Sequence, residues 1–75
     1  MIDVTQWEWI YNKDTKICYN EKYHVKVKFD WYGRTICGKI QEIPLELYRE
    51  IAIIPNGAEV LRQIISKAED AYYKS

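Results

Sequence analysis

The chemistry open to this chain is limited by a single histidine, His24, and by two cysteines, Cys18 and Cys37. General acid or base catalysis usually needs a histidine or paired carboxylates in a cleft that shifts their pKa. His24 falls instead in an alternating segment where we expect it to face solvent. Three glycines are too few for a loop of backbone amides around a phosphate. We therefore predict that the protein is not an enzyme and takes no cofactor.

The same three residues are also the candidate ligands for a metal ion. All three are predicted to lie on the outward face of one sheet, but zinc needs four convergent ligands. The chain has no Cys-x-x-Cys or His-x-x-x-His spacing. With one strand between Cys18 and Cys37, the sulfur atoms should lie roughly 9 to 10 Å apart, too far for a disulfide or a shared ion. The sequence thus predicts free thiols and no metal site.

A second set of residues has the chemistry of a binding surface on the outward sheet face. The set consists of His24, Lys26, Lys28, Tyr32 and Lys39. Lysine attracts phosphate and tyrosine stacks on bases, so this face is the candidate site for nucleic acid. The chain as a whole carries 11 basic and 11 acidic residues, however, and alternating lysines also keep a sheet face hydrated. Weak nucleic-acid binding is therefore our alternative hypothesis.

Aromatic residues point to a different class of partner. Three Trp and seven Tyr occur in 75 residues, and such side chains are enriched in protein interfaces. Trp9 and Trp31 are expected in the core, whereas Trp7, Tyr32, Tyr48 and Tyr73 are the rings that the pattern fixes least. Zero net charge also favours self-association. Our preferred prediction is an interaction or regulatory module that binds a protein partner or a second copy of itself, with no small-molecule substrate.

Length and composition restrict the class of protein further. A chain of 75 residues with 48% apolar residues is expected to form one small folded domain over residues 1–75. No stretch approaches the length of an apolar membrane span, and the first residues lack the pattern of a secretion signal. Two cysteines do not make the disulfide framework of a secreted mini-protein. We therefore expect a cytoplasmic protein that does not bind membranes.

Four strands are predicted to position these side chains, over residues 4–11, 15–20, 23–32 and 34–40. The third has the clearest pattern, because apolar residues from Tyr23 to Trp31 alternate strictly with polar ones. Opposed residues in an antiparallel pair share a face. On that test a loop at residues 32 and 33 places Phe29 opposite Ile36, and a three-residue loop at 12–14 places Trp9 opposite Ile17.

Two helices are predicted to follow, over residues 44–53 and 57–73. Pro44 suits a first helical turn, although residues 51–54 can also be read as a strand, and Pro55 ends the segment in either case. Asn56 and Glu59 resemble a capping box. One face of the second helix is apolar through Leu61, Ile64, Ile65, Ala68 and Tyr72.

The predicted fold class is therefore α+β: a four-stranded antiparallel meander with one face covered by a short helix and a longer C-terminal helix, in the order ββββαα. In architecture, a small sheet followed by a helix resembles the arm-type DNA-binding domains of phage integrases, which lay a sheet in the major groove. The resemblance implies that the outward sheet face with Lys26 and Lys28 would meet the nucleic acid. Such domains are usually basic, whereas Asp30 and Glu8 are predicted on this face.

Overall fold

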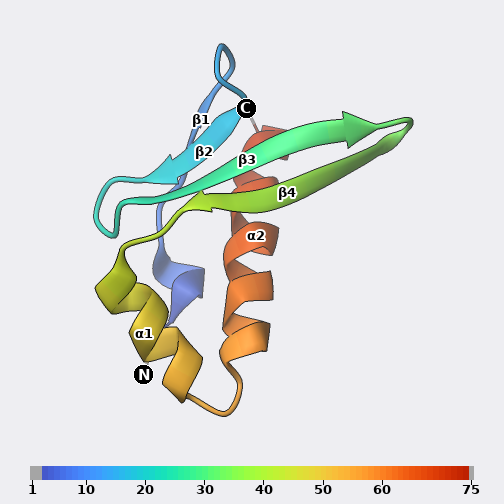
Figure 1. The fold of residues 1–75 in the computed structure, drawn as a ribbon. Helices are drawn as coiled ribbons and strands as arrows, with labels where there is room; N and C mark the ends of the chain where they lie inside the picture. Colours follow the sequence, from blue (N-terminus) through green and yellow to red (C-terminus); the bar gives the residue numbers. More distant parts are fainter. Residues whose placement is uncertain (1–2, 75) are drawn as a thin grey trace.

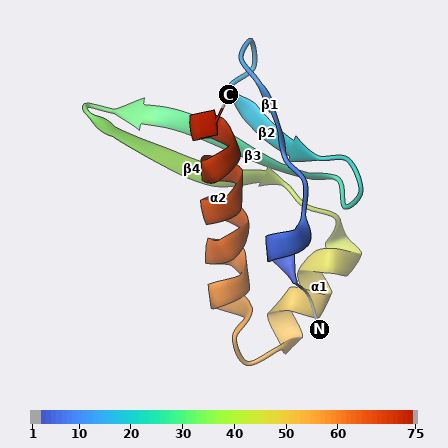
Figure 2. The same ribbon diagram turned by 180° about the vertical axis from the view of Figure 1, so that it is seen from behind.

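The computed structural model describes residues 3–74, and these residues adopt the predicted α+β fold (Figure 1). Four strands form one antiparallel sheet in the order β1-β2-β3-β4, and two helices follow. The elements are a 3-10 helix η1 (Val4–Gln6), strands β1 (Ile10–Asn12), β2 (Ile17–Asn20), β3 (Val25–Tyr32) and β4 (Thr35–Glu42), and helices α1 (Leu45–Ile53) and α2 (Gly57–Lys74). Seen from behind, α2 crosses one face of the sheet (Figure 2).

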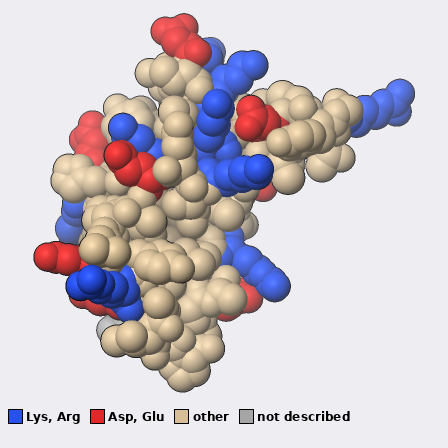
Figure 3. Space-filling view, viewed as in Figure 1, with Lys and Arg blue, Asp and Glu red and all other residues tan. Residues whose placement is uncertain are grey.

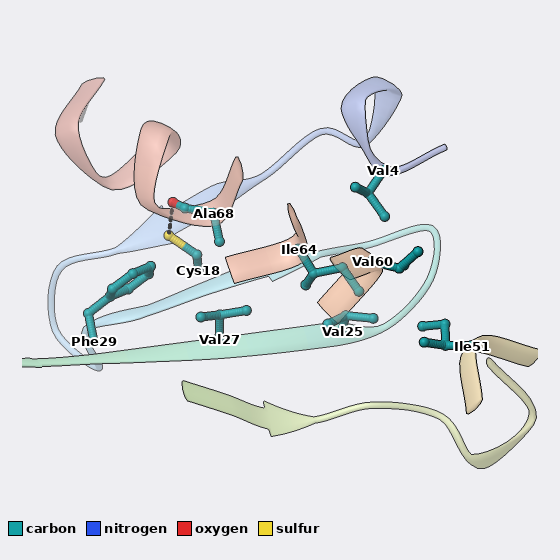
Figure 4. Packing of buried hydrophobic residues seen from close by; sticks show 9 residues of the cluster. All are labelled: Val4, Cys18, Val25, Val27, Phe29, Ile51, Val60, Ile64 and Ala68. Carbon is teal, nitrogen blue, oxygen red and sulfur yellow. Dashed lines mark hydrogen bonds between the residues drawn. The ribbon is translucent and has the colours of Figure 1, made fainter. Parts of the chain in front are cut away.

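Strand β3 has the two-sided character that its sequence predicts. Val25, Val27 and Phe29 are buried, whereas Lys26 and Lys28 between them are exposed. The buried side chains meet α2, whose own buried residues recur at spacings of three or four positions and so share one helical face. Figure 4 shows this core, which among the described residues consists of Val4, Cys18, Val25, Val27, Phe29, Ile51, Val60, Ile64 and Ala68.

The ambiguous segment at residues 51–54 ends a helix and does not add a strand. Ile51 is the buried residue of α1, and the helix continues to Ile53 before the backbone becomes extended at Ile54. Gly57 then opens α2 directly against α1, where an added Cβ would collide with the carbonyl oxygen of Ile51. The close approach of the two helices therefore requires glycine at this position.

The predicted first strand is mostly wrong. Residues 4–6 form η1, and β1 begins at Ile10. The Asp3 carboxylate accepts a hydrogen bond from the Thr5 N–H at 3.0 Å, which caps this helical turn. Val4 is fully buried in the core. Capping and burial together hold the chain start out of the sheet, in a segment where alternation alone predicted a strand.

The predicted pairing of β1 with β2 is also wrong, and the error reverses a face. Asn12 Oδ1 accepts hydrogen bonds from the N–H groups of Asp14 and Thr15, and Lys16 has a positive φ of 60°. This four-residue turn places Tyr11 opposite Cys18. The observed register differs from the predicted one by three positions, and an odd shift moves every side chain to the other face. Cys18 therefore points into the core, contrary to our expectation.

The turn between β3 and β4 lies one residue later than predicted. Gly33, with φ of +65°, and Arg34 form the loop, so that Tyr32 opposes Thr35. Phe29 is therefore opposite Gly38 instead of Ile36. The predicted faces are nevertheless correct, because from Val27 onward the opposing β4 residue shifts by two positions, an even number. At Lys26 a register irregularity adds one more position and brings Glu42 opposite this lysine.

Trp31 is not the core residue that we expected. It lies on the inner face of β3, yet 55% of its surface is exposed. Figure 1 shows why: the β3–β4 hairpin projects past α2, so its tip has no helix beneath it. Trp9, in contrast, is partly buried and packs against the core as predicted.

Gly38 provides a test of the packing between the sheet and α2. An added Cβ would lie 2.8 Å from Phe29 Cε1 and 2.9 Å from Ile65 Cγ2. We expect Gly38→Ala to lower the free energy of unfolding by about 1–3 kcal/mol, because both neighbours must move. Urea denaturation followed by circular dichroism measures this change. Cys37→Ala, at an exposed position on the same strand, is the control and should change stability by less than about 0.5 kcal/mol. Equal stability of the two variants would contradict the packing described here.

Candidate binding surfaces

The outer face of the sheet carries four of the five predicted site residues. Lys26, Lys28 and Tyr32 project from β3 and Lys39 from β4, and all four side chains are exposed. Both helices pack on the opposite face, so no described element covers these residues (Figure 1). The predicted placement of these four residues is confirmed.

His24, the fifth predicted site residue, is not on a strand. It lies in the turn between β2 and β3 with a positive φ of 57°, and its N–H donates to the Asn20 carbonyl at 2.9 Å. Asn20 is buried, and its side-chain oxygen accepts from the Tyr23 N–H at 2.6 Å. This local hydrogen bonding extends the turn through His24, so β3 begins at Val25 and not at residue 23 as predicted. His24 still reaches Lys26 and Glu42 across a shallow hollow of about 280 Å³.

Positive charge on the outer face is concentrated at one cross-strand pair. Lys28 is directly opposite Lys39, and like charges in that position repel. Lys26 differs, because its Nζ lies 3.4 Å from a carboxylate oxygen of Glu42. Figure 3 shows blue basic side chains gathered over the strands, with acidic groups beside them. The face is therefore locally basic around Lys28 and Lys39 but mixed at its margins.

The two thiols occupy different environments, so the proposed set of outward ligands is broken. Cys18 is fully buried, and its Sγ lies 3.3 Å from the Ala68 carbonyl oxygen, to which it donates. Burial raises the pKa of Cys18 to about 11. Cys37 is exposed on the outer face. Within residues 3–74, no group of three or more His, Cys, Asp or Glu side chains is arranged to hold a metal ion.

A cleft of about 600 Å³ lies near the chain start, where Trp7 stacks on Tyr23 at 4.4 Å. Its acidic lining residues include Asp3, and it contains neither histidine nor cysteine. Hydrogen bonds from the hydroxyl and N–H groups of Thr5 lower the pKa of Asp3. Because such a carboxylate stays ionised, Asp3 is a poor general acid.

The second candidate surface is the open edge of the sheet at β4. Strand order places β4 at the margin, with β3 on one side and no described strand on the other. The N–H of Phe29 donates to the Lys16 carbonyl at 3.1 Å, so the main chain of Phe29 points towards β2. Its partner Gly38 must then direct its own N–H and carbonyl groups away from β3. By alternation, Ile36 and Ile40 also present their main-chain groups at this edge.

Apolar side chains adjoin this edge on its inner side. Helix α2 passes beneath β4 at Gly38, where Ile65 is the close neighbour, and continues towards α1. We call the partly exposed surface there the helical shelf; it consists of Tyr48, Ala52, Ala58, Leu61 and Ile65. All of these except Ile65 line a groove of about 320 Å³ between the two helices. In Figure 3 uncharged atoms cover this part of the molecule, with charged side chains on both sides.

Sequence reasoning missed this second surface, although part of its signal was present. Tyr48 is one of the rings whose placement the sequence pattern fixes least, and Leu61 and Ile65 belong to the apolar face of α2. What the pattern did not contain was the relation between elements: α2 extends beyond the edge strand, and α1 returns beside it (Figure 1).

Comparisons with protein-family models, with curated proteins and with solved structures give no match for this chain. Among residues 3–74, neither helix has the length and apolar character needed to cross a bilayer. Any function for these surfaces must therefore be argued from their geometry.

The buried thiol predicts a specific pH dependence. Unfolding returns the pKa of Cys18 from about 11 to about 9.0, so between these values the unfolded chain holds fewer protons than the native one. Stability should therefore fall as pH rises through this window, and it should fall less in Cys18→Ala. Urea unfolding at several pH values measures the difference between the two proteins.

Thiol labelling provides the corresponding check on accessibility. In the native Cys37→Ser variant, Cys18 should react with a thiol reagent only on unfolding, whereas in the Cys18→Ala variant Cys37 should react at once. Rapid labelling of native Cys18 would contradict its burial.

Proposed function

We propose that this protein is a non-catalytic binding module whose partner is another protein, and that β4 and the helical shelf form the docking surface. The observation that carries this proposal is the open edge of an eight-residue strand lying above partly exposed apolar side chains. Exposed strand edges readily pair with other chains unless something covers or blocks them. Two features of β4 oppose such pairing: a charged side chain, Lys39, and the irregularity of the ladder between Ile40 and Glu42.

The exposed rings near this edge support the same proposal. Trp31 and Tyr48 are both exposed large side chains close to β4 or the shelf. Tryptophan and tyrosine supply much of the binding energy in protein interfaces, particularly where they fill apolar pockets. A protein partner would also shield Ile36, Leu61 and Ile65, which the fold leaves half-buried.

Affinity capture with matched variants tests this proposal. A protein that co-purifies with the wild-type chain should be retained roughly thirtyfold more weakly by Trp31→Ala, because interface tryptophans typically contribute about 2 kcal/mol. Tyr73→Ala is the control: Tyr73 is 63% exposed and lies near the end of α2, away from β4. Circular dichroism confirms that each variant folds. Equal retention by the two variants would contradict docking at β4.

A second candidate function is weak nucleic-acid binding by the outer face. The observation favouring it is the unrelieved pair Lys28 and Lys39, beside Tyr32 on a projecting two-stranded ribbon. Such a ribbon fits the DNA major groove, and a phosphate between the two ammonium groups would remove their repulsion. The neutral overall charge and the half-buried Asp30 on the same face count against high affinity.

A heparin or DNA column separates the two functions. If the lysine face binds nucleic acid, the wild-type protein should be retained at low salt and released steeply as salt increases. The double variant Lys26→Glu and Lys28→Glu should then pass straight through the column. Trp31→Ala keeps both lysines, so it should still be retained, even if less strongly than the wild-type protein. Elution of the wild-type protein in the void volume at low salt would overturn this second candidate.

A further inference from the structure

We infer that the partner contributes an extended segment with apolar side chains at alternate positions and an acidic side chain opposite Lys39, and that this segment adds to the sheet as a fifth strand beside β4. The inference rests on the proposed docking function and specifies the chemistry of the occupant. It is carried by three features of the same edge: the direction of the main-chain groups, the apolar shelf on the inner side, and Lys39 on the outer side.

The main-chain N–H and carbonyl groups of β4 point alternately towards β3 and towards the open edge. Thr35, Cys37 and Lys39 direct their N–H and carbonyl groups towards β3, as the two-residue loop between Tyr32 and Thr35 requires. Ile36, Gly38 and Ile40 direct theirs outward. An added strand can therefore exchange paired hydrogen bonds with three alternate residues of β4 without breaking any existing bond.

The inner side of the added strand meets apolar surface. Residues opposite Ile36, Gly38 and Ile40 share their face, which is the face that α2 covers. Gly38 has no side chain of its own, and Ile65 lies beneath it. An apolar residue opposite Gly38 would consequently reach Ile65, and its inward neighbours would pack on the rest of the shelf and near Trp31. Every second residue of the segment should therefore be apolar.

The outer side of the added strand meets positive charge. A residue opposite Lys39 lies on the outer face, where Lys39 already faces Lys28 across β4 and β3. A carboxylate in that position would compensate a like-charge pair, whereas another lysine would extend it to three in a row. The residue of the segment opposite Lys39 should therefore be acidic.

A second copy of this chain does not satisfy these requirements. Helix α2 passes from Ala68, beside Cys18 of β2, to Ile65 beneath Gly38 of β4. Antiparallel pairing of two β4 strands with inner faces on the same side would bring both α2 helices under the junction. When Gly38 of one copy pairs with Gly38 of the other, these helices would lie closer than the roughly 8–10 Å that packed helices need. If the two β4 strands instead paired in parallel about a twofold axis along the strands, the apolar inner face of one sheet would lie beside the lysine-bearing outer face of the other. In addition, β4 of a second copy carries Lys39 and no acidic residue between Thr35 and Ile40, so a different chain is the better occupant.

Short peptides test the inference directly on the full chain. The probe is a peptide of about seven residues, near the usual length of a strand, in which Glu and Val alternate. A Lys and Val peptide of the same pattern is compared with it. We expect the Glu peptide to slow hydrogen exchange at the amides of Ile36, Gly38 and Ile40 and to leave those of Cys37 and Lys39 unchanged. It should bind about 3- to 10-fold more tightly than the Lys peptide.

Charge reversal supplies the matched control. Lys39→Glu should invert the preference between the two peptides, whereas Lys74→Glu, an exposed lysine at the end of α2, should leave it unchanged. A Glu peptide N-methylated at alternate amides should bind only when the methyl groups point away from β4. A peptide of scrambled sequence controls for charge attraction alone.

The outcomes separate this inference from the function on which it rests. No binding by the Glu peptide, protection at other amides, or equal affinity for both peptides would overturn the acidic fifth strand. Loss of a co-purifying protein in Trp31→Ala but not in Tyr73→Ala would then still support docking at β4. Dimers of the wild-type chain that dissociate in Ile36→Lys would also overturn the inference, because the occupant would be a second copy.

Discussion

The fold depends on the burial of one face of β3 beneath α2. Val25, Val27 and Phe29 alternate with exposed lysines, so the strand has one face that must be covered and one that must not. Phe29 packs against Tyr72 with ring centroids 5.3 Å apart, and Gly38 lets Phe29 and Ile65 fill the space beside β4. Because these contacts fix which way β3 faces, they also fix the faces of its neighbours.

Covering one face with helices of limited length leaves two unlike surfaces exposed. The β3–β4 hairpin is longer than the part of the sheet that α2 covers, so its tip and Trp31 lie beyond the helix (Figure 1). At the β4 edge the relation is reversed, because α2 and α1 extend past the last strand. The outer face is exposed and locally basic around Lys28 and Lys39, whereas the β4 edge combines free main-chain groups with apolar side chains. This contrast is the physical basis for favouring a protein partner.

The chemistry of the site residues agrees with binding more than with catalysis. Burial holds the Cys18 thiol protonated and inaccessible to reagents, and His24 lies in an exposed turn. The cleft of about 600 Å³ near Trp7 and Tyr23 contains a carboxylate stabilised in its ionised form, Asp3. By contrast, the groups at β4 need no altered pKa to act, because strand pairing uses the main chain and the shape of the inner face.

The sequence by itself determined the fold class, the two faces of β3 and the outward position of Lys26, Lys28, Tyr32 and Lys39. These follow from strict alternation and from the pairing rule, which survive a displacement of the hairpin loop by one residue. Tertiary structure decided the rest. The side-chain bonds of Asn12 and Asn20 set the turns that bury Cys18 and remove His24 from the strand, and burial of Val4 bends the chain start into η1. The docking surface that we propose at β4 depends on how far the first turns of α2 extend past the sheet, and local periodicity carries no information about that distance.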